Sequence, residues 1–105
     1  MKPRQFEVYR VKGLRAEGPI DLVVILQSDL LDHLTTRVVA PLIPVTEGYL
    51  IDRVVPEVEI EGIRYAVAMH LIATLAERNL ATMVGKLNAS EIVLKNAIDM
   101  VFFGV

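Results

Sequence analysis

The chain has 105 residues, no cysteine and a formal net charge of −2 at pH 7. Without cysteine it forms no disulfide and no thiolate metal site, and it has no thiol nucleophile. The weakly negative charge argues against a protein that binds nucleic acid on its own, because such proteins normally carry a basic excess. No apolar run approaches the roughly 18 residues that span a membrane. We therefore expect a soluble, cytoplasmic protein with one domain over residues 1–105.

Three strands are expected in the first half of the chain. Residues 5–11 alternate between apolar and polar side chains, which is typical of a half-buried strand. Residues 20–26 form a nearly continuous, β-branched run that predicts a strand buried on both faces. Residues 37–45 are also apolar, but Pro41 and Pro44 cannot donate to a sheet ladder. We therefore expect this third strand at an edge or a bulge.

A hairpin is expected next, because residues 54–60 and 63–70 flank Glu61 and Gly62, a pair suited to a tight turn with positive φ at the glycine. Glutamates at every second position of this region would alternate outward as a solvated strand face.

A short helix over 71–78 and a strand over 80–84 should follow, and Gly85 is expected to break the chain before a last helix. Asn88 is a good N-cap for that helix, and Glu91, three residues later, would complete a capping box.

Apolar side chains recur at helical spacing along this last helix and would face a core: Leu94, Ala97, Ile98, Val101 and Phe102. Residues 100–105 are unusually apolar, so they need a cover or a partner; composition alone favours packing in the domain or in a dimer interface. Because 53% of the residues are hydrophobic, we expect a homodimer. About five short strands in mostly hairpin order indicate an α+β fold, a small antiparallel barrel or sheet with a C-terminal α-helix.

Signatures of enzymes and metal sites are nearly absent. His33 and His70 lie far apart without a ligand pattern around either, so we expect no metal site and no cofactor. One segment could supply a reaction centre, because a ribonuclease needs a base and a cation, and Asp32 or His33 with Arg37 provides those types. The simpler alternative is a solvated turn in which Ser28 or the neighbouring Asp29 caps local amides.

Basic residues gather in the first fifteen positions, where Glu7 is the one acid: Lys2, Arg4, Arg10, Lys12 and Arg15. Such a cluster could attract an acidic partner, with a solvated charge run as the simpler alternative.

Two segments resemble a known family. Residues 26–32 (Leu-Gln-Ser-Asp-Leu-Leu-Asp) and 37–42 (Arg-Val-Val-Ala-Pro-Leu) are similar to a pattern of Gln-Ser-Asp, two aliphatics, Asp, a short turn, Arg and a Pro-Leu strand. Residues 94–98 (Leu-Lys-Asn-Ala-Ile) leading into 102–105 (Phe-Phe-Gly-Val) resemble Ile-Lys-Asn-Ala-Ile ending Phe-Trp-Gly-Ile. Both patterns are those of the CcdB toxins of plasmid-type toxin–antitoxin systems.

The resemblance implies an SH3-like barrel with a C-terminal helix, a homodimer, and action by binding without catalysis. CcdB toxins bind the A subunit of DNA gyrase and trap it on cleaved DNA, and a cognate antitoxin relieves this through a disordered C-terminal segment. Operator DNA is bound only by the toxin–antitoxin complex, mainly through the antitoxin. The gyrase-binding residues implied here are Phe103, Gly104 and Val105, supported by Phe102, Asp99, Ser28, Leu30 and Leu31. We expect Arg10, Lys12 and Arg15 to bind the antitoxin.

Two positions depart from the family pattern. Phe103 replaces a tryptophan, which would cost on the order of 1–2 kcal/mol at an interface, and Asp99 replaces an asparagine. Two alternatives therefore stand beside the gyrase poison. One is a MazF-like endoribonuclease toxin on a related barrel, with Arg37 and Asp32 or His33 as its chemistry. The other is an inactive homologue that still binds the antitoxin.

Overall fold

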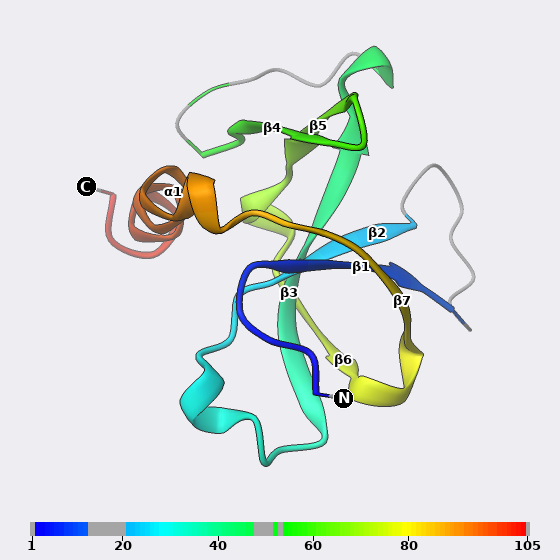
Figure 1. Ribbon diagram of the computed structural model, residues 1–105. Helices are drawn as coiled ribbons and strands as arrows, with labels where there is room; N and C mark the ends of the chain where they lie inside the picture. Colours follow the sequence, from blue (N-terminus) through cyan, green and yellow to red (C-terminus); the bar gives the residue numbers. More distant parts are fainter. Residues whose placement is uncertain (1, 13–20, 48–51, 53, 105) are drawn as a thin grey trace.

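The computed structural model describes residues 2–12, 21–47, 52 and 54–104. In this part of the chain a curled antiparallel sheet of seven strands is flanked by one α-helix, α1 (Glu91–Phe103) (Figure 1). The strands are β1 (Glu7–Val11), β2 (Leu22–Ile25), β3 (Thr36–Pro44), β4 (Glu57–Ile60), β5 (Ile63–Val67), β6 (Ala73–Ala76) and β7 (Leu80–Lys86). Their order is β4-β5-β3-β2-β1-β7, and β6 also pairs with β3. The predicted α+β class and barrel-like sheet are confirmed.

Strand β3 lies at the centre of this sheet, so its expected place at an edge was wrong. It pairs with β2 through residues 39–42, with β5 through 42–44 and with β6 through 36–39. Pro41 is tolerated because it lies opposite the break between β5 and β6, where its carbonyl accepts a hydrogen bond from Ala68 N at 2.9 Å. Its nitrogen points to the same side of the strand, where no ladder partner is needed.

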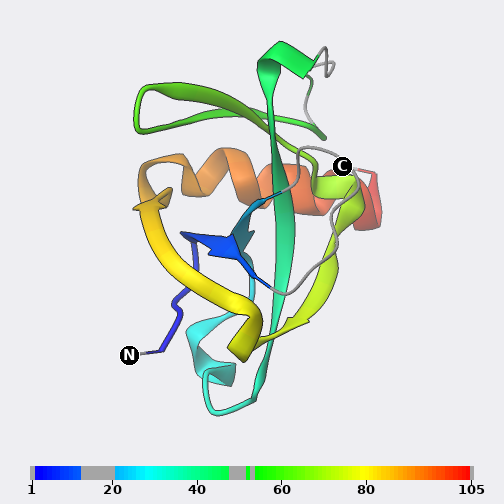
Figure 2. The same cartoon turned by 90° about the vertical axis from the view of Figure 1, so that its right-hand side faces the viewer.

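The sheet has two apolar clusters because β2 is buried on both faces, as predicted. Leu22 and Val24 enter the larger cluster with Leu94 and Ala97 of α1, while Val23 and Ile25 point into a smaller one on the opposite face. The helix runs across the sheet behind β3 (Figure 2). It therefore covers the larger cluster and is held by it.

The β4–β5 hairpin has the predicted turn. Ile60 pairs with Ile63, and Glu61 and Gly62 have φ values of 52° and 79°. Two consecutive positive φ angles are the geometry of a type I′ turn, which suits the twist of a two-residue hairpin. Glu57 is exposed and forms an ion pair with Arg64 at 3.3 Å across the two strands.

The expected helix over 71–78 was wrong. This segment forms β6 between two short 3-10 turns, because its backbone pairs with the first half of β3. Tertiary pairing here overrides the helical preference of its Ala, Leu and Glu residues. Gly85 likewise does not break the chain but lies inside β7, opposite Val8. A Cβ at Gly85 would meet Ile60 Cδ1 at 2.8 Å, so the glycine serves close packing.

The start of the last helix also differs from the capping box expected at Asn88. Residues Asn88–Ser90 form a 3-10 turn without a side-chain cap, and α1 begins only at Glu91. Instead of bonding back to the cap, the Glu91 carboxylate accepts a hydrogen bond from Lys95 Nζ at 2.7 Å, one turn further on.

Candidate functional site

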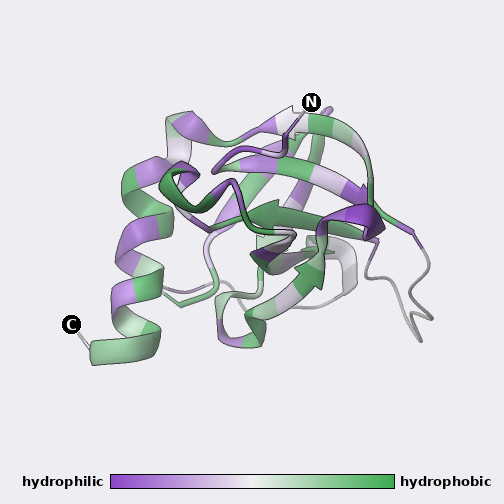
Figure 3. Cartoon of the chain, turned by 90° about the horizontal axis from the view of Figure 1, so that it is seen from below, coloured by the Kyte–Doolittle hydropathy of each residue, from purple (hydrophilic) through white to green (hydrophobic). Residues whose placement is uncertain are grey.

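The last turn of α1 presents aromatic side chains to solvent. Leu94 and Ala97 are fully buried, whereas Phe102 is 61% and Phe103 is 76% exposed. Gly104 ends the helix with φ 74°, and its N–H donates to Met100 O at 3.1 Å. The end of the helix that lies near the C-terminus is apolar in character (Figure 3). Val105 lies outside the described residues.

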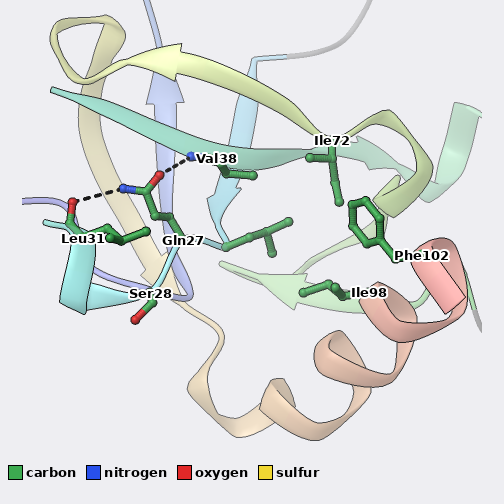
Figure 4. Close-up of a pocket in the computed structure, with 8 residues that line it drawn as sticks. Gln27, Ser28, Leu31, Val38, Ile72, Ile98 and Phe102 are labelled. Atoms are coloured by element: carbon green, nitrogen blue, oxygen red, sulfur yellow. Dashed lines mark hydrogen bonds between the residues drawn. The ribbon is translucent and has the colours of Figure 1, made fainter. Parts of the chain in front are cut away.

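An apolar groove of about 270 Å³ separates this turn from the loop between β2 and β3. Phe102, Ile98 and Ile72 gather at one end of the groove, and Gln27, Ser28 and Leu31 at the other (Figure 4). Leu26 and Val38 complete the lining. The groove thus brings together Phe102, Leu31 and Ser28, three of the residues implied by the resemblance, from segments about seventy positions apart.

The β2–β3 loop, residues 26–35, carries a further implied residue, Leu30, next to the groove-lining Leu31. Its 3-10 turn Asp29–Leu31 is capped by Ser28, whose Oγ accepts a hydrogen bond from Leu30 N at 3.1 Å. Leu30 is 87% and Leu31 is 44% exposed. Large apolar side chains so placed at a loop tip are candidates for a partner surface.

The residues considered as a reaction centre lie in or beside a turn in which Ser28 caps a local amide, as the simpler alternative expected. Asp29 pairs with Arg4 at 3.0 Å and also accepts a hydrogen bond from Gln5 N at 2.8 Å. Arg37 is 1% exposed, and its guanidinium donates to backbone carbonyls. His33 is exposed. The guanidinium charge is therefore enclosed by the protein in this structure.

Comparison with known families shows the family to which the chain belongs. The family model described as CcdB protein matches residues 5–104. The chain belongs to the CcdB family. Its members are toxins of toxin–antitoxin systems, and this chain is therefore such a toxin. Among curated proteins, none matches its sequence.

Solved structures resemble this CcdB-family chain in fold. An endoribonuclease from a mycobacterial species, solved in complex with its cognate antitoxin, has a TM-score of 0.76 at 17% identity and covers 94% of this chain and 93% of its own. The toxin MazF-mt6 of Mycobacterium tuberculosis has a TM-score of 0.73 at 20% identity, over 91% of this chain and 95% of its own. At such identities the likeness concerns the fold alone.

The basic residues near the start of this CcdB-family toxin are largely paired with acids. Arg10 forms an exposed ion pair with Asp21 at 3.1 Å, and Lys2 lies 3.9 Å from Asp32. Lys12 is exposed on the chain that leaves β1. Arg15 lies outside the described residues. The antitoxin-binding role of Arg10, Lys12 and Arg15 stays a prediction.

Glu7, the one acid among the basic residues at the start of the chain, is buried. Its Oε1 accepts hydrogen bonds from Arg4 N at 2.8 Å and from the Tyr9 hydroxyl at 3.1 Å. Burial and the hydrogen bond to Glu7 raise the pKa of Tyr9 to about 12. The hydrogen bond from Arg4 N ties the residues before β1 to that strand.

Across residues 2–12, 21–47, 52 and 54–104, no group of three or more acidic or histidine side chains is placed to hold a metal ion. Within the same residues, α1 is too short to cross a membrane.

Proposed function

We propose that this CcdB-family toxin binds the A subunit of DNA gyrase and poisons the enzyme without catalysis of its own. The binding surface, which we call the α1–loop surface, consists of Ser28, Leu30, Leu31, Asp99, Phe102, Phe103, Gly104 and Val105. The observation that carries the proposal is the exposure of two adjacent aromatic rings, Phe102 and Phe103, beside a groove that Leu31 and Ser28 also line. Aromatic side chains with an adjoining apolar pocket are typical of interface hot spots.

The two departures from the family pattern are compatible with this proposal. Phe103 keeps an exposed aromatic ring where the family has tryptophan, and it loses only the larger face and the indole N–H donor. Asp99 is exposed one turn before the end of α1, where a carboxylate is unfavourable for the helix dipole. A cationic group on the partner would offset that cost, so we expect Asp99 to favour a basic surface of the target.

A pull-down with the gyrase A subunit tests the proposal. The full-length chain is compared with a chain that lacks residues 103–105, and with Ile63→Ala as a matched control, since Ile63 is an exposed apolar residue on β5 outside the α1–loop surface. We expect the deletion alone to abolish both gyrase binding and growth inhibition. A deletion variant with an unchanged circular dichroism spectrum and full toxicity would refute the proposal.

We propose further that a cognate antitoxin relieves the toxin through an acidic disordered segment bound at Arg10, Lys12 and Arg15. The exposed Arg10–Asp21 pair supports this, because exposed ion pairs contribute little and exchange readily for an incoming carboxylate. Affinity for the antitoxin should fall with rising salt and in Arg10→Glu, but not in Arg64→Glu, which disrupts a similar exposed pair on the hairpin. Insensitivity to both salt and Arg10→Glu would remove this site. We further propose that operator DNA is bound only by the complex of the toxin with its antitoxin, and not by the toxin alone.

We also propose that the toxin is a homodimer, supported by exposed apolar side chains outside the α1–loop surface, such as Ile92 and Val93 on α1. Light scattering coupled to gel filtration measures this directly, and a mass of one chain at micromolar concentration would contradict it.

A second candidate function, RNA cleavage, is favoured by one observation, the fold likeness to an endoribonuclease. The proposed chemistry would use Arg37 with Asp32 or His33. Burial of Arg37 counts against it, and His33 is the most accessible of the three. Incubation with RNA discriminates the two functions, because specific cleavage that is lost in Arg37→Ala and His33→Ala would replace the gyrase proposal. Antitoxin binding without gyrase binding or cleavage would instead identify an inactive homologue.

A further inference from the structure

We propose that Arg37 is a positioning residue: it holds the β2–β3 loop in the shape that presents Leu30 and Leu31 to the partner. The inference rests on the proposed function, in which those leucines form part of the gyrase-binding surface. It adds a buried residue, outside that surface, on which partner affinity depends.

The Arg37 guanidinium is bound to the inner side of the loop through its two terminal nitrogens, Nη1 and Nη2. Nη1 donates to Leu34 O at 2.7 Å and to Thr36 O at 2.9 Å, and Nη2 donates to Asp32 O at 3.1 Å. Two carbonyls of the loop and the carbonyl of Thr36, the first residue of β3, thus converge on a single side chain. The turn has no strand ladder to hold it, so these bonds fix its backbone.

The same guanidinium ties the loop to two other parts of the molecule. Nε donates to Pro3 O at 3.4 Å, and Nη2 lies 3.4 Å from Glu77 Oε2, on the 3-10 turn between β6 and β7. The loop, the N-terminal segment and that turn are therefore joined at Arg37. The side chain itself is 1% exposed, so it takes no direct part in binding.

The Gln27 side chain also holds the loop in place through hydrogen bonds to backbone groups. Its Nε2 donates to Leu31 O at 3.3 Å and to Thr36 O at 3.1 Å, while its Oε1 accepts a hydrogen bond from Val38 N at 3.2 Å. Polar groups of the loop are thereby turned toward the protein, and Leu30 and Leu31 remain on the outer side. The leucines are held in place before any partner arrives.

A buried arginine contributes little net stability, because removal of its charge from water costs several kcal/mol per ion. Its benefit lies in geometry: a planar fork with five donors can satisfy several carbonyls at fixed angles, which the single ammonium of lysine cannot do. If the loop is already ordered in its bound shape, binding does not have to lose the conformational entropy of ordering the loop. Loss of Arg37 should therefore weaken binding through Leu30 and Leu31 while the sheet stays folded.

Hydrogen exchange of the isolated toxin tests the positioning role without any partner. In Arg37→Lys, which keeps the charge, the amides of Leu31, Asp32 and Leu34 should exchange roughly tenfold faster or more. These amides donate to carbonyls within the loop at 3.0–3.1 Å in the native chain. Amides of β2 should be unchanged. Unchanged loop exchange would overturn the inference. If Arg37→Lys does not fold, Glu77→Gln, which removes only the ionic contact, should accelerate the same amides by a smaller factor, and no acceleration there would also overturn it.

A double-mutant cycle on gyrase A subunit affinity separates positioning from general destabilisation. Arg37→Lys should weaken binding about tenfold in the native background, but less than about twofold when Leu30→Ala and Leu31→Ala are already present. Equal losses in both backgrounds would show that Arg37 acts through overall stability, and the inference fails. If the unmutated toxin does not bind gyrase, the proposed function fails, and the exchange measurement alone then decides the role of Arg37.

Discussion

The replacement of Phe103 by alanine should separate binding from folding. Full burial of a phenylalanine side chain contributes roughly 1.5–3 kcal/mol. Since Phe103 is 76% exposed in the free chain, about three quarters of this, roughly 1–2 kcal/mol, remains for a partner to gain. Phe103→Ala should therefore weaken gyrase A subunit binding about 5- to 30-fold in Kd. Its free energy of unfolding should change by less than about 0.5 kcal/mol, because the ring hardly contributes to the core.

Calorimetric titration gives the affinity, and urea unfolding gives the stability of the same samples. Phe103→Trp is the matched opposite change, since it restores the family residue, and it should tighten binding by on the order of 1 kcal/mol. A folded Phe103→Ala variant with native affinity would refute the reasoning, because the exposed ring would then have no partner. A variant that unfolds would also contradict it, since the ring would then support the core.

Three further predictions concern stability. Gly85→Ala should lower the free energy of unfolding by roughly 1 kcal/mol through its contact with Ile60 Cδ1, and Ile60→Val should relieve part of that loss in the double variant. Gly104→Ala meets no neighbour but must adopt φ near 74°, so thermal unfolding should show a cost of roughly 1 kcal/mol. Because the pKa of Tyr9 is raised from 10.0 to about 12, its contribution is present below pH 10 and is lost as pH rises towards 12. Urea unfolding should show this slope in the native chain and not in Tyr9→Phe, whereas an identical slope in both would contradict the role of the Glu7 contact.

Local sequence signals predicted those parts of the fold that depend on neighbours in the chain. The turn at Glu61 and Gly62 followed from its residue types, and β2 followed from its uninterrupted apolar run. The segment that forms β6 has a helical composition, and only its pairing with β3 makes it a strand. Likewise, Pro41 suggests an edge until the break between β5 and β6 is known. Long-range pairing, which periodicity does not reveal, decided these elements.

The candidate site was predictable in part. The resemblance indicated Phe102, Leu31 and Ser28, and the groove contains all three. Ile72 was missed, because it lies in the segment expected as a helix, and its side chain reaches the groove only through the turn before β6. Arg37 was considered for chemistry because a ribonuclease needs a cation beside its base. Nothing in the sequence indicates that its donors are directed at carbonyls of the preceding loop.

The dependence of α1 on the sheet affects how genetic selections for lost toxicity would be interpreted. A helix of 13 residues is marginal by itself in water, where isolated helices below about 12–15 residues hardly form. Leu94 and Ala97 supply the packing that keeps it ordered. Changes beneath the helix would therefore silence the toxin as effectively as changes at its exposed rings. The mutations recovered from surviving cells should therefore lie largely in the core. Only variants that keep the native thermal stability would identify residues of the partner surface.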